Sequence, residues 1–137
     1  MINTLLTQVI SHLKTSDDLT DIIDNRIYSY HPDSILPYPL IIVSTSSKIT
    51  EYVNREHSFI ISVAFQIFSD KKGISEINSI QSLLFNLLHN KELVQPTNVF
   101  IQSGTFISNK SYADFDSVLK KNISIGISEY KYMLSNI

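Results

Sequence analysis

The chain has 137 residues, of which 43% are hydrophobic and 18% charged, and its mean hydropathy is +0.05. This profile is typical of one folded domain over residues 1–137 and excludes a disordered chain. The 11 Lys and Arg residues against 13 Asp and Glu give a net charge of −2, which disfavours a dedicated nucleic-acid binder. Cysteine is absent, which excludes disulfides, thiolate metal sites and cysteine nucleophiles.

Targeting and nucleotide-binding signals are also missing from the sequence. No apolar run reaches the roughly 18–20 residues that span a bilayer, and Met1–Thr4 lacks the basic start of a signal peptide. We therefore expect a soluble protein made inside the cell. The glycines Gly73, Gly104 and Gly126 form no phosphate-cradling loop.

The first part of the chain predicts two helices and a short strand. Apolar residues recur every three or four positions over residues 2–13, as on an amphipathic helix. Ser16 or Asp17 can cap a second, short helix. Arg26–Tyr30 then favours a short strand.

A proline-marked lead and an apolar strand follow. Leu36–Pro39 is expected to be extended, because each proline restricts its predecessor to extended geometry. Leu40–Ser44 is apolar on both faces, which indicates a strand away from the sheet edge. Thr45–Arg55 is polar and mixed in charge, and we expect a long loop or a protruding hairpin arm there.

Phe59–Phe68 has the clearest strand pattern in the chain. Side chains alternate between two faces of a strand. The apolar face, expected in the core, carries Phe59, Ile61, Val63, Phe65 and Ile67. The mixed face, expected to be half covered or to meet another subunit, carries Ile60, Ser62, Ala64, Gln66 and Phe68.

A polar break at Ser69–Gly73 separates this strand from the best-defined helix. Ile74–Leu88 carries apolar residues at helical spacing and polar residues on the opposite side, and the helix is expected to end around His89-Asn90.

The last third predicts further strands. Val99–Ile101 alternates, and Gly104 marks a bulge or bend. Ser108–Ala113 is expected to be a polar connection before a final strand over Asp116–Ser128. The whole order predicts an α+β fold: a mainly antiparallel sheet with an N-terminal helix and one central amphipathic helix packed on one face.

Candidates for chemistry are weak. The histidines His12, His31, His57 and His89 form no metal-binding pattern, so helix-end or exposed positions are favoured. A second candidate is a cluster of four carboxylates, Asp17, Asp18, Asp21 and Asp24. A solvated helix face is favoured over a cation site there, because the glycine and the closing glutamate of an EF-hand loop are missing.

Two further patterns have ordinary explanations. Asp114 and Asp116 could do acid–base work, but two acids near a turn are usually turn residues. A Ser–His–Asp set stays open because serines are abundant, although no GxSxG elbow is present. Lys71-Lys72 and Lys120-Lys121 are small basic spots, for which ordinary surface charge is favoured over contact with DNA or an acidic partner.

From Arg26-Ile27-Tyr28 through the proline-flanked Leu36-Pro37-Tyr38-Pro39-Leu40-Ile41-Ile42-Val43, the chain resembles phage tail-completion proteins. These are tail terminator or tail-to-head joining proteins of long-tailed phages, prophages and gene transfer agents. The pattern continues with the long strand and polar break over Phe59–Lys72. It ends with an amphipathic helix carrying the paired leucines Leu83-Leu84 and Leu87-Leu88, and with late strands.

The resemblance implies a non-enzymatic virion protein of the tail or neck, assembled in the host cytoplasm. Such proteins form a ring of six copies on the head-proximal end of the tail tube, stop its polymerisation and let the head dock. The implied partners are further copies of the chain, the tail-tube protein and a head–tail connector or stopper. The resemblance implies neither a membrane partner nor sequence-specific nucleic-acid binding. It also implies no cofactor, no metal and no catalytic residue.

Two sets of residues are expected to make the contacts. Candidate subunit or tube contacts are Lys48, Tyr52, Arg55, Ile60, Gln66 and Phe68. Candidate basic residues facing the lumen through which DNA passes are Lys71, Lys72, Lys120 and Lys121. Two other functions stay open: a small α+β enzyme or ligand-binding domain with a pocket between helix and sheet, and a cellular device derived from a phage tail.

Overall fold

The computed structural model describes residues 2–30, 37–45, 51–54, 58–117 and 120–136. In these segments the chain forms three helices and seven strands. In chain order they are α1 (Ile2–Lys14), α2 (Asp17–Ile23), β1 (Ile27–Tyr28), β2 (Leu40–Thr45), β3 (Glu51–Asn54), β4 (Ser58–Ser69), α3 (Ser75–Leu88), β5 (Val99–Ile101), β6 (Thr105–Asp116) and β7 (Lys121–Asn136). None of the helices in this described part is long and apolar enough to cross a membrane.

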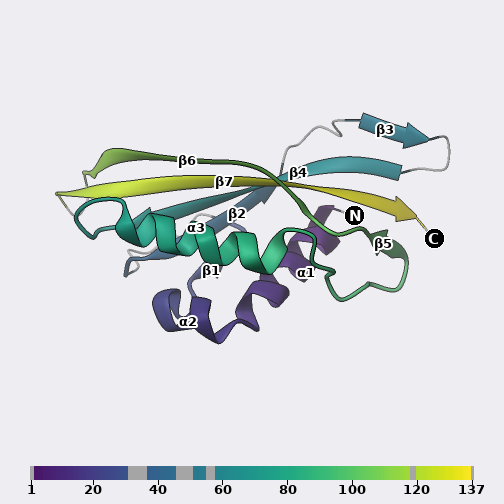
Figure 1. The fold of residues 1–137 in the computed structure, drawn as a ribbon, viewed down its shortest axis with the longest axis horizontal. Helices are drawn as coiled ribbons and strands as arrows, with labels where there is room; N and C mark the ends of the chain where they lie inside the picture. The colour runs from purple at the N-terminus through teal and green to yellow at the C-terminus, as the bar shows by residue number, and fades with distance from the viewer. Residues whose placement is uncertain (1, 31–36, 46–50, 55–57, 118–119, 137) are drawn as a thin grey trace.

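The strands form one sheet around the pair β4–β7 (Figure 1). The order β1-β2-β4-β7-β5 is completed by β3, which pairs with the start of β4, and by β6, which pairs with β7. Every pair is antiparallel except β1–β2. The α+β fold and the mainly antiparallel sheet predicted from the sequence are therefore confirmed.

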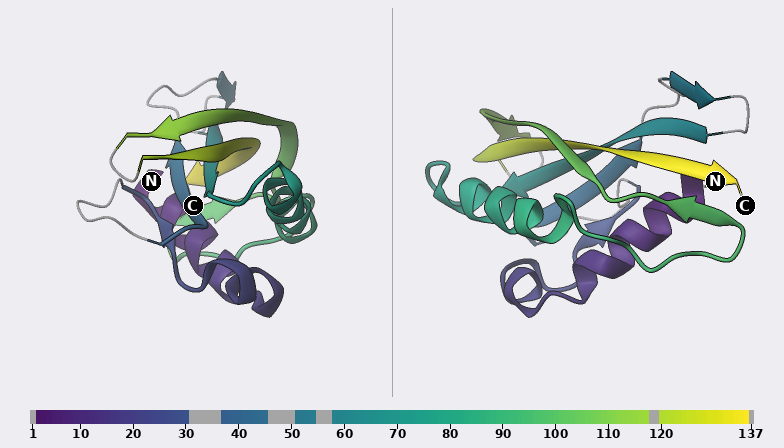
Figure 2. Two further views of the ribbon diagram at one scale, coloured as in Figure 1. Left: turned by 90° about the vertical axis from the view of Figure 1, so that its left-hand side faces the viewer. Right: turned by 45° about the vertical axis from the view of Figure 1, so that its right-hand side comes forward.

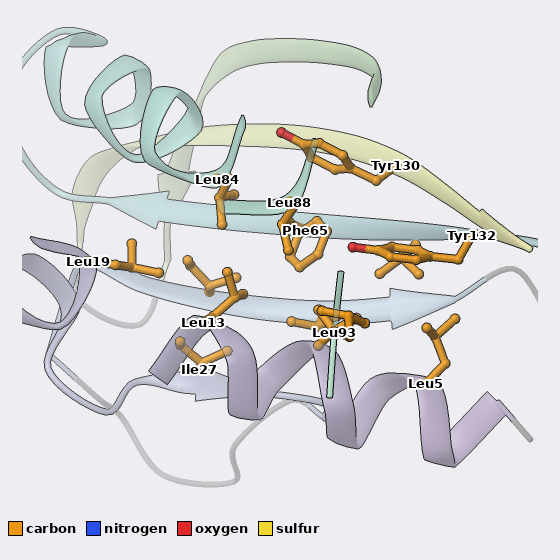
Figure 3. Packing of buried hydrophobic residues seen from close by; sticks show 14 of the residues in the cluster. Leu5, Leu13, Leu19, Ile27, Phe65, Leu84, Leu88, Leu93, Tyr130 and Tyr132 are labelled. Carbon is orange, nitrogen blue, oxygen red and sulfur yellow. The ribbon is translucent and has the colours of Figure 1, made fainter. Parts of the chain in front are cut away.

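All three helices of the described segments lie on the same side of the sheet (Figures 1 and 2). α1 packs on β1 and β2, whereas α3 packs on β4, β7 and β6. The core fills the layer between helices and sheet, and Leu5 and Leu13 of α1, Leu84 and Leu88 of α3 and Phe65 of β4 all belong to it (Figure 3). His12 ties the two long helices together, because its Nε2 donates to the Leu87 carbonyl oxygen at 2.8 Å.

The strand β4 has the predicted alternation. Its core face is confirmed for Ile61, Val63, Phe65 and Ile67, each at most 1% exposed. Phe59 is half-buried, because it lies near the start of the strand. β2 lies between β1 and β4, as its apolar pattern predicts.

Helix ends follow local chemistry. Ser16 caps α2, and its Oγ accepts a hydrogen bond from the Leu19 N–H at 3.3 Å. The first turn of α3 is held by Glu76, whose carboxylate accepts a 2.6 Å hydrogen bond from Ser69 Oγ and lies 3.1 Å from Lys71 Nζ. The negative charge also suits the positive end of the helix.

The prediction of a polar connection at Ser108–Ala113 is wrong, because these residues lie inside the 12-residue strand β6. β6 is an edge strand that is exposed on both faces over most of its length. It therefore lacks the apolar alternation that marks a half-buried strand. The predicted final strand, Asp116–Ser128, is also displaced: Asp116 ends β6, and β7 begins at Lys121.

The predicted arm at Thr45–Arg55 is described only in part. Its described residues include β3, which forms an antiparallel pair with the first residues of β4. β3 lies at the far end of the sheet from the β6–β7 turn (Figure 1). The bulge expected at Gly104 occurs slightly later, between Phe106 and Ser108.

Gly104 itself is needed for packing. A Cβ at this position would lie 2.6 Å from Cζ of the Tyr132 ring. Tyr132 is 1% exposed and cannot move outward. The glycine therefore lets the chain cross close to a rigid, buried aromatic ring.

Three hydroxyl groups in the core, those of Ser128, Tyr130 and Tyr132, have no hydrogen-bond partner among the described residues. Burial raises the pKa of Tyr130 to about 12, and burial together with the neighbouring Tyr130 raises the pKa of Tyr132 further. Both rings contribute to the core through their apolar atoms (Figure 3).

These tyrosines predict alkaline unfolding. A tyrosine whose pKa is higher in the folded state stabilises the fold below the unfolded pKa of about 10, and that stability is lost as the pH rises through the folded pKa. Tyr130 alone should remove about 2–3 kcal/mol of unfolding free energy between about pH 10 and 12. Urea unfolding at a series of pH values, followed by circular dichroism, measures this loss.

Tyr130→Phe should abolish that part of the loss. At pH 7 the variant should be as stable as the parent or more stable by up to about 1 kcal/mol, because an unpaired buried hydroxyl is removed. Tyr30→Phe is the matched control, since Tyr30 is 65% exposed and should leave the pH dependence unchanged. A clear destabilisation by Tyr130→Phe at pH 7 would mean that its hydroxyl has a strong partner.

Candidate interaction surface

The side of the sheet away from the helices is the candidate functional surface, and we call it the outer face. It carries the alternate residues of β4: Ile60, Ser62, Ala64, Gln66 and Phe68. All five are neither fully buried nor fully exposed. The predicted mixed face of this strand is therefore half covered, and no helix of the described segments lies over it (Figure 2).

An apolar row crosses the outer face near the β6–β7 turn. Directly opposite residues on neighbouring strands share a face, and here they are Leu40, Phe68, Ile125 and Tyr112. Leu40 and Ile125 are 7% and 5% exposed, whereas Tyr112 at the sheet edge is 47% exposed. The row is thus close-packed at its centre and open at the edge.

The neighbouring row is half polar. It crosses the same four strands with Ile42, Gln66, Ile127 and Lys110. Beyond it the outer face becomes charged, with Glu129 opposite Ala64 and Lys131 opposite Ser62.

The far end is apolar again. Ile60 lies opposite Met133, and Phe100 on β5, which is 45% exposed, lies opposite Ser135, two residues beyond Met133 on the same face of β7. The outer face therefore has two apolar ends separated by a polar centre. This pattern suits contact with another protein, in which apolar and polar groups are interspersed.

The predicted contact residues are partly brought together. Ile60, Gln66 and Phe68 share the outer face. Tyr52 lies in β3, at a position whose side chain is outside the described residues, and Lys48 and Arg55 lie outside them altogether. The sequence did not indicate Leu40, Ile42 or Tyr112 as part of this surface, because only the strand register shows which of their two faces they occupy.

The four predicted basic residues lie at one end of the molecule, in or beside the β4–α3 loop and the β6–β7 turn. Lys121 Nζ contacts Asp70 Oδ2 at 2.8 Å, and Lys71 is paired with Glu76. Lys72 and Lys120 are exposed, and the described residues provide no salt bridge to either. Half of the predicted basic charge is therefore already matched by nearby carboxylates.

Tyr38 links this end of the sheet together. Its hydroxyl donates to Asp116 Oδ2 at 2.6 Å, and Lys121 Nζ lies 5.2 Å from the centre of its ring. Burial, together with the Asp116 hydrogen bond, raises the pKa of Tyr38 to about 12. The contact joins the proline-marked lead of β2 to the β6–β7 turn.

The structure gives the other chemical candidates ordinary contacts. Asp114 accepts a hydrogen bond from the Phe115 N–H, and His89 Nδ1 accepts one from the Phe106 N–H. Within the described segments, no group of three or more His, Asp or Glu side chains is placed to hold a metal ion.

A polar groove lies between α2, α3 and the lead of β2. It is lined by Asp21, Arg26, Tyr38, Lys71 and Glu76, among others. Three of its charged groups are engaged by near neighbours: Arg26 Nε donates to the Pro39 carbonyl, and Lys71 is paired with Glu76. The groove is open and brings together no recognisable catalytic set.

These features define an α+β protein with helices on one face of its sheet and, on the other, a partly apolar face over which none of the described helices lies. The sequence matches no protein-family model and no curated protein. Among solved structures, the fold matches a chain of the "Virion of native gene transfer agent (GTA) particle", with a TM-score of 0.78 and 10% sequence identity. The match covers 98% of this chain and 97% of that chain, so the two share a fold over nearly their whole length.

Proposed function

We propose that this chain is a structural virion protein at the head-proximal end of a phage or gene transfer agent tail. It forms a ring that ends tail-tube polymerisation and allows the head to join. The observation that carries this proposal is the nearly full-length fold match to a chain of a gene transfer agent virion. The ordered motifs from Arg26-Ile27-Tyr28 to the paired leucines of α3 support the more specific role.

In this proposal the outer face is the contact surface. A ring requires a head-to-tail interface that closes on itself. The apolar end around Phe68 and the apolar end around Ile60 supply area to bury, while Gln66 and the charges between them set the register. The arm containing Lys48, Tyr52 and Arg55 reaches the neighbouring copy or the tail-tube protein.

The basic end has a smaller role. Lys72 and Lys120 face the lumen and weakly attract the DNA backbone as it passes, helped by Lys71 and Lys121. Because nearby carboxylates match much of this charge, no tight or sequence-specific DNA binding is expected. Other contacts are made with a head–tail connector or stopper protein.

Deleting the gene from its genetic element tests the function directly. Electron microscopy of lysates should show over-long tails, or heads and tails left unjoined. Wild-type chain supplied in trans should restore particles, and a Phe68→Asp variant should fail to do so although it folds.

A matched control separates folding from contact. Asp18→Ala on the solvent side of α2 should restore particles as well as wild type does, and circular dichroism should show that all variants fold. Normal particles after deletion would rule out the proposed role. Full rescue by Phe68→Asp would show that the outer face is not the contact surface in this role.

A further inference from the structure

The strand β6 forms a long open edge of the sheet. It has 12 residues and pairs with β7 alone within the described part of the chain. Residues 109–115 are all exposed. Such an edge is a template for another strand unless charges or bulges prevent pairing.

The hydrogen bonds show which backbone groups of β6 point outward. Phe115 N–H is bonded to the Asp114 carboxylate at 2.8 Å and therefore does not point to β7. Alternate residues of an antiparallel strand direct their N–H and C=O groups the same way. Asn109, Ser111 and Ala113 thus present their backbone groups to the outside.

The outer-face side chains of β6 complement themselves. Lys110 and Asp114 each lie two residues from Tyr112, one on either side. In an antiparallel pair of β6 strands centred on Tyr112, the two tyrosines face each other and each lysine faces an aspartate. Aromatic pairs and opposite charges directly across two strands are both stabilising.

We propose that two copies of this chain associate edge to edge through antiparallel β6 strands, with the two-fold axis at Tyr112. Lys110 lies opposite the partner's Asp114, and Asp114 opposite the partner's Lys110. The backbone of Ser111 bonds to the partner's Ala113. The Asn109 N–H donates to the partner's Phe115 carbonyl, whereas the Phe115 N–H keeps its bond to the Asp114 carboxylate. The same patch serves both copies, as a two-fold interface requires.

The arrangement has a consequence for the outer face. Edge pairing about an axis perpendicular to the sheet keeps the outer faces of both copies on the same side. The two faces therefore join into one larger surface, with both apolar rows meeting at the paired tyrosines. This association uses the sheet edge and does not depend on the virion role.

A single cysteine tests the pairing, since the chain contains none of its own. Directly opposite residues in a non-hydrogen-bonded pair have Cα atoms about 4.5 Å apart, within disulfide reach. Tyr112→Cys should form a disulfide-linked dimer under mild oxidation at least about tenfold faster than Ser111→Cys, whose cysteine faces an alanine. Both positions are exposed and adjacent, so their reactivity towards a small thiol reagent provides the control.

Charge reversal provides the second test. Lys110→Asp and Asp114→Lys each place like charges opposite one another, and each should raise the dimer dissociation constant at least about tenfold. Mixing the two variants should restore association, because the mixed pair again has opposite charges. Sedimentation velocity over a range of concentrations measures all three.

Three results would overturn the proposal. The first is that the wild-type chain stays monomeric up to about 1 mM. A dissociation constant above that concentration would mean a binding free energy weaker than about −4 kcal/mol. Tyr112→Cys could cross-link no faster than Ser111→Cys. The two charge variants could fail to associate on mixing while wild type dimerises. None of these three results would change the particle defects expected in the deletion strain. Failure of the edge-pairing proposal can therefore be told apart from failure of the proposed virion role.

Discussion

Replacing Phe65 with alanine is expected to lower the free energy of unfolding by about 3–5 kcal/mol. Phe65 is 0% exposed and lies on β4, whose two neighbours there, β2 and β7, leave it no route to solvent. Removing the ring deletes a large apolar contact area and leaves a cavity that the surrounding strands cannot close.

The ring also begins a chain of aromatic contacts. It meets Tyr130 edge-on at 5.7 Å, Tyr130 meets Phe106 at 5.6 Å, and Phe106 meets Phe85 on α3 at 5.5 Å. This chain connects the centre of the sheet to the C-terminal half of α3. Its loss should add to the cost of the cavity.

Urea unfolding followed by circular dichroism measures the effect. Phe100→Ala is the control, since Phe100 is 45% exposed on β5, and its cost should be less than about 1 kcal/mol. Phe65→Leu should fall between the two. A loss below about 1 kcal/mol for Phe65→Ala would mean that this site is not the centre of the core.

Adding a side chain at Gly126 is expected to have the second large effect. A Cβ there would lie 2.5 Å from Ile77 Cγ2 and 3.0 Å from Gln81 Nε2, both on α3. Ile77 is 0% exposed and branched at Cβ, so it cannot turn aside. Gly126→Ala should cost about 1–3 kcal/mol by overpacking, and Gly126→Val should cost more.

The physical reason is the close approach of α3 to β7. Gln81 donates to the Lys110 carbonyl at 3.0 Å and so reaches across to the edge strand. A larger residue at Gly126 would lift the helix and weaken this bond as well. Ser128→Ala, two residues further along the same face, is the control and should change stability little, because its hydroxyl has no partner in the described structure.

A double-mutant cycle identifies the cause. Ile77→Ala alone should destabilise by making a cavity, but it should offset part of the cost of Gly126→Ala. Strictly additive effects would show that the two positions do not meet. The unfolding free energies of the four proteins provide the measurement.

The helix side of β7 was not evident from the sequence. Its most apolar residues, Ile123, Ile125 and Ile127, form a regular alternation that would ordinarily mark the core face. The register with β4 places them on the outer face, and it turns Ser124, Gly126 and Ser128 towards α3. Small residues on this side let the helix lie close to the strand, and this requirement outweighed hydropathy.

The candidate surface was predicted only in part, because the strand register that assembles it is not visible in the sequence. The mixed face of β4 was visible as an alternation, so Ile60, Gln66 and Phe68 were identified together. Tyr112 and Lys110 were not, because their segment was interpreted as a polar connection. An edge strand exposed on both faces has no apolar period, and only its partner β7 shows that it is a strand.

By itself, the sequence determined the elements whose signals are local. These are the amphipathic α1 and α3, the Ser16 cap of α2 and the alternation of β4, and each depends on residues a few positions apart. The tertiary structure alone decided the parallel pairing of β1 with β2, the open edge at β6 and the position of Ile125 and Ile127 on the outer face of β7. These features depend on contacts between distant residues, whose register is set by how the helices and strands pack and not by local propensity.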